Sequence, residues 1–531
     1  MPASARWTVS TYDYVVVGAG TAGCVLAARL SEDPDTRVLL LEAGGRGGPE
    51  AMASPDPLSS FSLWGSSVDW AYTTTAQTGT GDAVHAWPRG KVLGGSSAIN
   101  GMVHHRGHPA GYDAWEAQGA TGWNYRELLP FFRRSESAEG RDPAVRGTDG
   151  PMRIEPVPAP GALAQAAFNS AVETGHKRLD DGNGHEAEGV SWRETNVVAG
   201  HRQSAADAYL SPVLGRPNLT VVTGALARRL LVEDARCRGV EYTMGGETHT
   251  AVAERETVLA AGAVGSPHLL MLSGIGPADH LRSVGVPVTA DLPGVGANLQ
   301  DHVTSYVVYA SQEAPPSAGP SAEAQVVARS SAGAAPDLLL LFVGAALRPR
   351  WTGAEPGGYS ILFSLMDPAS RGTLRLQDAD PASAPLLDPA YLTDDRDLDR
   401  LLAGLRLARQ LGRTGALASL GTAELFPGID VTDDEACRAY LRTTASTYFH
   451  PVGTCRMGTD TSAVVDPELR VRSTAGLRIA DASVMPSLVS APTNATVLAI
   501  AERAAHLMRT GADATAGGTS GISTRLGSVE E

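Results

Sequence analysis

The sequence predicts an α/β fold that opens with a parallel-sheet unit and continues into a second domain of strands and helices. Three observations favour this fold class. A strand, a glycine-rich turn, a helix and another strand follow one another between Thr11 and Gly44. Strand-like apolar runs recur over residues 218–260. A separate block of apolar strands and one amphipathic helix spans residues 338–412.

The first unit has the features of a nucleotide-binding turn. Tyr14 to Val17 is a short apolar run that suits a strand buried on both faces of a parallel sheet. Gly18, Gly20 and Gly23 follow this strand. In a dinucleotide site the first glycine permits a tight turn, the second lets the backbone approach a pyrophosphate, and the third lets the helix pack closely. The helix N-terminus would then face the anion.

The next strand supports the same interpretation. Val38 to Leu41 is apolar and leads into Glu42, whose carboxylate is placed to accept hydrogen bonds from a ribose diol. A glycine turn that serves packing alone is the alternative. The strand before the turn, the helix after it and the acid beyond favour nucleotide binding. The turn by itself does not distinguish NAD from FAD.

Two later stretches are rich in small residues. Trp87 to Asp113 gathers glycines, serines and Asn100, which let a backbone lie against a flat or charged ligand. An ordinary surface loop explains these residues equally well when they are taken alone. Ala260 to Pro277 predicts a strand end, a small-residue turn and a short helix, and is another place where backbone could approach a ligand.

Composition excludes several classes of function. The 531 residues carry 43 basic and 58 acidic side chains, a net charge of −15, which argues against binding to a nucleic-acid backbone. The four cysteines are far apart and form no C-x-x-C pair, so neither a disulfide framework nor a thiolate zinc site is indicated. His104, His105 and His108 share a loop without helical spacing or a carboxylate partner, so we expect no metal site there.

The sequence predicts a cytoplasmic protein, monomeric or homodimeric, without a transmembrane segment. The polar N-terminus runs directly into the first core strand, so we expect no signal peptide. The longest apolar stretch, Leu338 to Leu347, is too short to cross a bilayer as a helix. Dispersed cysteines fit a reducing compartment.

Two segments lack any periodicity. Ala310 to Pro336 is rich in alanine, serine and proline, and we expect a mobile loop or lid there. Residues 511–531 are rich in glycine, alanine, serine and threonine, and we expect a disordered tail.

We expect the chemistry near the C-terminus. His450 sits between Phe449 and a proline, although taken singly it is better explained as a packed or solvent-facing histidine. Asp481 ends a short strand, and a proline, a threonine and Asn494 then open an apolar helix. The N-terminus of a helix suits the anionic charge of a reduced flavin, and a histidine across the ring could take a proton from an alcohol.

Taken together, these motifs resemble the glucose-methanol-choline (GMC) oxidoreductase family, from about Tyr12 to about Met508. They occur in family order as GAGTAG, GKVLGGSSAIN, GAVGSPHLLMLSGIG, SRGTLRLQDADPASAPLLDPAYL, HPVGTCRMG, GLRIADASVMPS and PTNAT. The resemblance implies FAD as the cofactor.

The resemblance also implies the domain organisation. A Rossmann-like FAD-binding domain of GMC type would be assembled from three pieces, residues 1–155, 200–310 and 455–510. A discontinuous α+β substrate-binding domain, built on an antiparallel sheet, would comprise residues 156–199 and 311–454.

Site residues follow from motif position in the family. His450 takes the place of the catalytic base, and Asn494 takes the place of a second histidine or asparagine that hydrogen-bonds the substrate oxygen. Phe449 resembles the aromatic residue before the base in relatives that oxidise aryl alcohols and hydroxymethyl furans. The implied FAD-binding positions are Gly18, Gly20, Thr21, Ala22, Gly23, Glu42, Ala43, Gly90, Val92, Gly95, Ser96, Asn100, Gly101, Met102, Val103, Ala227, Ala261, Asp481, Ala482, Asn494, Ala495 and Thr496.

Two positions depart from the family pattern. Members that bind FAD covalently through the glycine-serine loop carry a histidine where this sequence has Ile99, so we expect non-covalent FAD. His104 stands where an aromatic residue or alanine is usual, which affects the expected packing near the cofactor.

The resemblance implies an FAD-dependent enzyme that oxidises a primary alcohol to an aldehyde. His450 would remove the hydroxyl proton while hydride passes to flavin N5, and Phe449 favours a hydroxymethyl group on a ring. Molecular oxygen and another electron acceptor both stay open. The alternatives are choline dehydrogenase or oxidase activity, a non-redox hydroxynitrile lyase, and a flavin-binding protein that docks a partner. For choline, no aromatic cage or carboxylate is evident from Ala310 to Met366.

Overall fold

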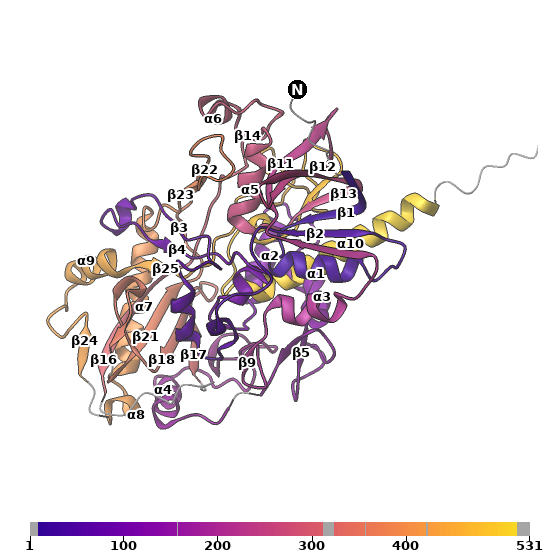
Figure 1. Cartoon of the computed structure of the whole chain (residues 1–531). Coiled ribbons are helices and arrows are strands. Elements are labelled where there is room, and N and C mark those ends of the chain that lie inside the picture. The colour runs from indigo at the N-terminus through magenta and orange to yellow at the C-terminus, as the bar shows by residue number, and fades with distance from the viewer. Residues whose placement is uncertain (1–8, 157, 312–322, 356, 421–422, 518–531) are drawn as a thin grey trace, which may run out of the picture.

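The computed structural model describes residues 9–156, 158–311, 323–355, 357–420 and 423–517. Two large sheets lie at opposite ends of the molecule, and long loop segments fill the space between them (Figure 1). The α/β fold predicted from the sequence is confirmed, with one sheet of mixed direction and one antiparallel sheet.

The first sheet has seven strands, and three separate parts of the chain build it. Its order is β10 (Leu219–Thr223), β2 (Val38–Glu42), β1 (Val9–Val17), β13 (Glu247–Leu259), β12 (Arg236–Met244) and β11 (Leu226–Glu233), with β26 (Leu477–Ile479) paired to β13. The strands from β10 to β13 and β26 run parallel, whereas β13, β12 and β11 are antiparallel. Every residue of β2 is buried, as its continuous apolar run predicts.

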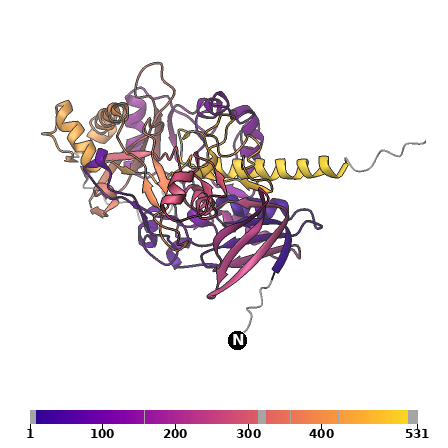
Figure 2. The same cartoon turned by 90° about the horizontal axis from the view of Figure 1, so that it is seen from above.

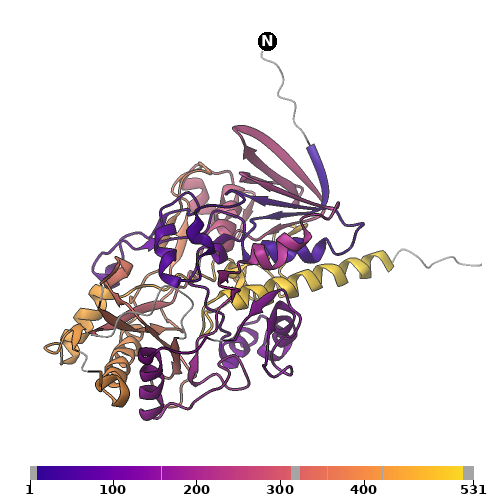
Figure 3. The ribbon, with the colours of Figure 1, turned by 60° about the horizontal axis from the view of Figure 1, so that its bottom comes forward.

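Two helices cover one face of this sheet. They are α1 (Thr21–Leu30) and α10 (Asn494–Gly517), and they pack against each other (Figure 3). Close packing of α1 on β1 requires a glycine, because a Cβ at Gly23 would lie 1.8 Å from the carbonyl oxygen of Gly18. The far end of α10 extends beyond the sheet (Figure 2).

The second sheet is antiparallel throughout and also has seven strands. Its order is β24 (Glu424–Phe426), β16 (Val303–Ala310), β21 (Gly358–Leu365), β18 (Leu338–Val343), β17 (Ala324–Ala328) and β7 (Gly189–Trp192), with β25 (Ser446–Thr447) paired to β16.

Both faces of the second sheet are buried, and alternate residues serve the two faces. On one face Leu340 and Phe363 pack with α7 (Asp395–Gly412). On the other face Leu341 and Leu362 belong to a separate apolar cluster that borders a cavity. This arrangement explains why these strands read as unbroken apolar runs.

Shorter elements connect the sheets. The remaining α-helices are α2 (Pro109–Ala117), α3 (Tyr125–Ser135), α4 (Ala162–Glu173), α5 (Gly262–Leu272), α6 (Ala278–Ser283), α8 (Gly415–Ala418) and α9 (Asp434–Thr444). Short strand pairs are β3 (Tyr72–Thr73) with β4 (Ala86–Trp87), β5 (Glu136–Ala138) with β6 (Met152–Ile154), β8 (Val197–Val198) with β9 (His201–Arg202), β14 (Ile275–Gly276) with β15 (Ala290–Asp291), β19 (Ala346–Leu347) with β20 (Ala354–Glu355), and β22 (Thr373–Arg375) with β23 (Leu386–Asp388).

Three boundaries differ from the sequence-based expectations. Strand β17 lies inside the segment 310–336 expected to be a loop, and its five residues are all buried; residues 312–322 lie outside the described part of the chain. Strand β16 falls within the expected FAD-binding piece 200–310, and it pairs in the second sheet. Helix α10 continues through Gly517, past the expected start of the tail, and residues 518–531 lie outside the described residues.

Within the described residues, no helix is both long and apolar enough to cross a membrane. Cys24, Cys237, Cys437 and Cys455 are all buried free thiols. The cytoplasmic location remains a prediction.

A buried carboxylate joins the helices under the first sheet. Glu502 of α10 is fully buried and accepts hydrogen bonds from Arg29 Nε and Nη2, at 2.9 and 2.7 Å, and from the hydroxyl of Tyr209 at 2.9 Å. Arg134 Nε of α3 lies 3.1 Å from the same carboxylate. Removing one member of such a cluster leaves charges without partners in the interior.

We therefore expect Glu502→Ala to lower the free energy of unfolding by about 3 to 5 kcal/mol. Urea unfolding followed by tryptophan fluorescence measures this change. Exposed Glu247→Ala, on β13, is the matched control and should change the free energy of unfolding by about 0.5 kcal/mol or less. Equal stability of Glu502→Ala and the parent would contradict the role given to this cluster.

Candidate active site

One cavity of about 840 Å³ lies between the two sheets. Val17 and Leu41 border it from the first sheet, and Leu341 and Leu362 border it from the second. Its lining combines the glycine turn after β1, the small-residue loop around residue 95, the turn that carries His450 and the start of α10. The cavity thus brings together segments from nearly the whole length of the chain.

The glycine turn and the small-residue loop meet at one end of this cavity. Gly20 and Gly95 lie so close that a Cβ on Gly95 would be 2.6 Å from the Cα of Gly20. Gly95 also has φ +53°, a backbone conformation that favours glycine. Two bare backbone segments in contact form a surface that a pyrophosphate can approach closely.

Glu42 lines the same end, and its carboxylate is already held by backbone. Oε2 accepts from Ala19 N at 2.9 Å and Oε1 accepts from Gly44 N at 2.8 Å. Burial raises the pKa of Glu42 above its usual value, against the opposing effect of these backbone donors. Each carboxylate oxygen has a second lone pair, so a ribose diol can still donate to it.

Asp481 organises the adjoining wall. One carboxylate oxygen accepts from Gly262 N at 2.9 Å, at the start of α5, and the other accepts from Ser483 N at 2.8 Å. Burial raises the pKa of Asp481, and the hydroxyls of Ser266 and Ser483 act in the opposite direction. The Asp481 side chain therefore lines the cavity and also joins the start of α5 to the turn around Ser483.

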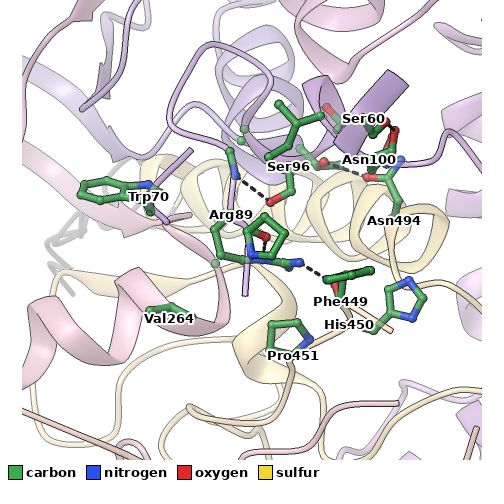
Figure 4. A pocket seen from close by; sticks show the side chains of 18 of the residues that line it. Ser60, Trp70, Arg89, Ser96, Asn100, Val264, Phe449, His450, Pro451 and Asn494 are labelled. Atoms are coloured by element: carbon green, nitrogen blue, oxygen red, sulfur yellow. Dashed lines mark hydrogen bonds between the residues drawn. The ribbon is translucent and has the colours of Figure 1, made fainter. Parts of the chain in front are cut away.

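His450 is held by a strained turn at the other end of the cavity. Phe449 has φ 66°, which is uncommon for a residue with a bulky side chain. Three hydrogen bonds hold this turn. Arg89 Nη2 donates to Phe449 O at 2.7 Å (Figure 4). Phe449 N donates to Thr447 Oγ1 at 2.8 Å, and His450 N donates to Asp301 Oδ1 at 2.7 Å. Strain maintained by several contacts is typical of functional positions.

The surroundings of His450 keep its imidazole neutral. Burial lowers the pKa of His450 well below its usual value, and the positive charge of Arg89 acts in the same direction. The edge of Tyr448 packs against the imidazole with ring centroids 4.8 Å apart. A neutral histidine that lines a cavity can accept a proton there.

Aromatic side chains surround this end of the cavity. Phe449 lies 4.9 Å from Trp64 and 5.5 Å from Trp351 between ring centroids, and Phe61 lies 4.8 Å from Trp64. Together with Tyr448, which stacks parallel to Trp351, these residues form what we call the aromatic cluster; all five line the cavity. Aromatic faces of this kind bind flat rings or quaternary ammonium groups.

An ion pair also borders the cavity. Arg193 Nη1 lies 2.6 Å from Glu323 Oε2, and both side chains are almost fully buried. Burial raises the pKa of Glu323, while the guanidinium of Arg193 lowers it. Glu323 and Trp351 both belong to the segment from Ala310 to Met366, where no aromatic cage or carboxylate is evident from the sequence alone.

Asn494 lies at the start of α10 and lines the cavity. Its Oδ1 accepts from Thr21 Oγ1 at 2.8 Å, which ties the start of α10 to the glycine turn after β1. No hydrogen bond joins Asn494 to His450 in the part of the chain that the structure describes, although both line the cavity. Because Thr21 takes the carbonyl oxygen, the amide Nδ2 is available to donate to an oxygen in the cavity.

Most residues assigned by motif position line the cavity. They are Gly18, Gly20, Thr21, Ala22, Glu42, Ala43, Gly90, Gly95, Ser96, Asn100, Gly101, Met102, Val103, Ala227, Ala261, Phe449, His450, Asp481, Ala482 and Asn494. Their contacts with a cofactor remain a prediction.

Four assigned residues do not line the cavity. Gly23 packs α1 onto β1, and Val92 lies in a small apolar core. Ala495 is buried in the main core, and Thr496 shares a hydrogen bond of 2.9 Å with the hydroxyl of Tyr112. Consecutive residues of a helix point in different directions, so only part of the PTNAT motif can face one cavity.

The three clustered histidines have separate partners. His104 Nε2 lies 2.6 Å from Glu136, His105 Nδ1 lies 3.3 Å from Gln325, and His108 Nδ1 accepts from Ala110 N at the start of α2. Among the described residues, no group of three or more His, Cys, Asp or Glu side chains is placed to hold a metal ion. The unusual His104 belongs to a buried ion cluster that includes Arg106 and Glu136.

Sequence reasoning missed the rest of the lining near His450. Trp64, Trp351, Arg193 and Glu323 come from loops and strand ends scattered over the chain, and no local pattern marks them. The sequence marks Pro492 only as the opening of a helix, and the structure places it in the cavity lining.

Comparison with known proteins gives the family. Models of the GMC oxidoreductase family match residues 12–304 and 368–501. Human mitochondrial choline dehydrogenase is 38% identical over 94% of this chain and 90% of its own length. An alcohol dehydrogenase (acceptor) of Pseudomonas putida is 36% identical over 94% of this chain and 95% of its own length.

A solved structure agrees with this result. The crystal structure of pyridoxine 4-oxidase from Mesorbium loti superposes with a TM-score of 0.89 and 37% identity, covering 94% of this chain and 99% of that one. The resemblance inferred from the motifs is confirmed, and with it the class of FAD-dependent oxidoreductases. The chain belongs to the GMC oxidoreductase family.

Proposed function

We propose that this protein oxidises a primary alcohol on an aromatic ring to the aldehyde, with non-covalently bound FAD and with His450 as the base. The observation that carries this proposal is a neutral, buried histidine beside the aromatic cluster in one cavity. The aromatic cluster would hold the ring of the substrate, and His450 would accept the proton of its hydroxyl group.

The lining of the cavity supports FAD as the cofactor. Its glycine end suits a pyrophosphate, and the start of α10, joined to the glycine turn by Thr21 and Asn494, places a positively polarised helix end at the cavity. When bound, FAD supplies the acceptor for the hydride that leaves the substrate carbon. Asn494 Nδ2 would donate a hydrogen bond to the substrate oxygen as its proton departs. The name of the pyridoxine 4-oxidase agrees with a ring-borne alcohol.

Choline oxidation is the second candidate. The aromatic cluster also suits a quaternary ammonium group, and several relatives are named choline dehydrogenases. However, the carboxylate of Glu323 is paired with Arg193, which weakens its attraction for a cation. We therefore rank the aromatic alcohol first.

The two candidates separate in single-turnover experiments. Without oxygen, benzyl alcohol and pyridoxine should bleach the flavin absorbance of the purified protein faster than choline. His450→Ala should slow this bleaching by about 10²- to 10⁴-fold, because the base is lost. His105→Ala, which removes another buried histidine away from the cavity, is the matched control and should bleach at a rate near that of the parent.

Other outcomes would contradict the proposal. Faster bleaching with choline would favour the second candidate. Unchanged flavin with cyanide release from cyanohydrins would indicate a lyase. A His450→Ala variant as fast as the parent would remove His450 as the base. Repeating the reaction in air and measuring peroxide decides whether oxygen is the electron acceptor.

The low pKa of His450 predicts the pH dependence. A base must be unprotonated, and a folded-state pKa below 6.5 keeps the imidazole neutral as the pH falls through that value. The rate of flavin bleaching should therefore show no lower limb centred on pH 6.5, the ordinary pKa of a histidine. Stopped-flow measurements across this range test it, and a lower limb centred at or above pH 6.5 would contradict the neutral state of His450.

We also expect FAD to dissociate when the protein unfolds. Ile99 lines the cavity and has no nucleophilic atom for a bond to the flavin. After acid precipitation, the yellow colour should remain in the supernatant. Flavin fluorescence in the washed pellet would show a covalent bond and contradict this expectation.

A further inference from the structure

Two histidine rings meet directly behind the cavity wall. His302, just before β16, is fully buried, and its Nδ1 lies 2.9 Å from Nδ1 of His450. The rings are nearly perpendicular, with an interplanar angle of 86°. A hydrogen bond between two ring nitrogens needs one donor and one acceptor, so one of the two Nδ1 atoms carries the proton.

The other side of His302 determines which nitrogen is the donor. Nε2 of His302 lies 3.1 Å from the carbonyl oxygen of Met366, and a carbonyl can only accept. Nε2 therefore carries a proton. Burial lowers the pKa of His302 to about 3, against the opposing effect of the Met366 and Val489 carbonyls, so the ring is neutral and has no second proton. Its Nδ1 must accept, and Nδ1 of His450 must donate.

We propose that His302 is a positioning residue that fixes His450 in the tautomer protonated on Nδ1, leaving Nε2 bare as the proton acceptor for the substrate hydroxyl. No other side chain or backbone group among the described residues hydrogen-bonds the imidazole of His450. The inference rests on the proposed function, because it needs His450 as the base.

Backbone contacts hold the two histidines in this relation. Tyr448 N donates to the carbonyl of His302 at 2.9 Å, and His450 N donates to Asp301. Two hydrogen bonds thus join the segment before β16 to the turn that carries His450. Rotating the His450 ring by half a turn would replace Nδ1 by a carbon opposite His302 and lose the hydrogen bond.

A neutral partner has a different effect from a carboxylate. Asp301 is the nearby acid, but its oxygens accept from the His450 backbone and from the hydroxyls of Thr447 and Tyr391 instead of the imidazole. A carboxylate on the imidazole would stabilise the protonated ring and raise its pKa. His302 orients the ring without adding a negative charge, so His450 stays neutral and ready to accept a proton.

The tautomer of His450 can be measured by NMR in the absence of substrate turnover. In holoenzyme labelled with [15N]histidine, two-bond 1H–15N correlation spectra distinguish protonated from bare ring nitrogens, and His450→Ala identifies the His450 signals. We expect a protonated Nδ1 and a bare Nε2 for His450 in the parent. A protonated Nε2 in the parent would overturn the inference, whatever the variants do.

Variants test the consequence for the reaction. His302→Ala should reduce the rate of flavin bleaching by benzyl alcohol at saturation about 100-fold, because a misoriented base slows proton transfer without weakening substrate binding. The apparent Kd for benzyl alcohol should change by less than about threefold, because the aromatic cluster is intact. His302→Asn places an acceptor oxygen near the position of Nδ1 and should recover the rate to within about tenfold of the parent. His105→Ala is again the matched control.

The outcomes separate this inference from the proposed function. If His450→Ala bleaches as fast as the parent, the proposed function fails. If His450→Ala is slow but His302→Ala is as fast as the parent, only the role of His302 fails. Equal loss in His302→Ala and His302→Asn, with the His450 tautomer unchanged in both, would reduce His302 to a packing residue and overturn the inference.

Discussion

The buried carboxylate of Asp301 is the constraint on which the rest of the site depends. It accepts from the backbone of His450 and from the hydroxyls of Thr447 and Tyr391, and Tyr391 in turn accepts from Trp87 Nε1 at 2.9 Å. Burial raises the pKa of Asp301 to about 6, and the hydrogen bonds that its carboxylate accepts act in the opposite direction. One side chain therefore joins the turn that carries His450 to segments near residues 87 and 391.

That network explains how a strained turn persists. The positive φ of Phe449 is unfavourable for a bulky residue, and hydrogen bonds from Arg89 and to Thr447 and Asp301 together outweigh this cost. The turn places the imidazole against His302 on one side and the cavity on the other. The first sheet borders the glycine-turn end of the same cavity, and the second sheet supplies an apolar wall.

The sequence predicts the first sheet and its glycine turn better than the apolar wall that the second sheet supplies. The strand, glycine turn and helix at residues 14–30 form a local pattern, and the structure has β1 and α1 there. Position within a motif is a weaker guide: Thr496 turns away to Tyr112, and Val92 packs in a core, because side-chain direction changes at each residue.

The aromatic cluster and His302 could not be predicted from local pattern. Trp64 lies hundreds of residues before Trp351 and Phe449 in the sequence, and only the folding of the chain brings the three rings together. Strand β17 lies in a composition typical of loops, yet pairing with β7 and β18 on either side buries it. Tertiary contacts override local propensity in such cases.

If the proposed function holds, a carbon-bound hydrogen of an aromatic primary alcohol is transferred in this cavity. The most direct measurement compares benzyl alcohol with its α,α-dideuterated form in anaerobic stopped-flow reduction of the bound flavin. We expect a slower reduction with the deuterated alcohol at saturation, because cleavage of the C–H bond occurs in the observed step. If neither alcohol reduced the flavin, the proposed oxidation of an aromatic primary alcohol would be contradicted.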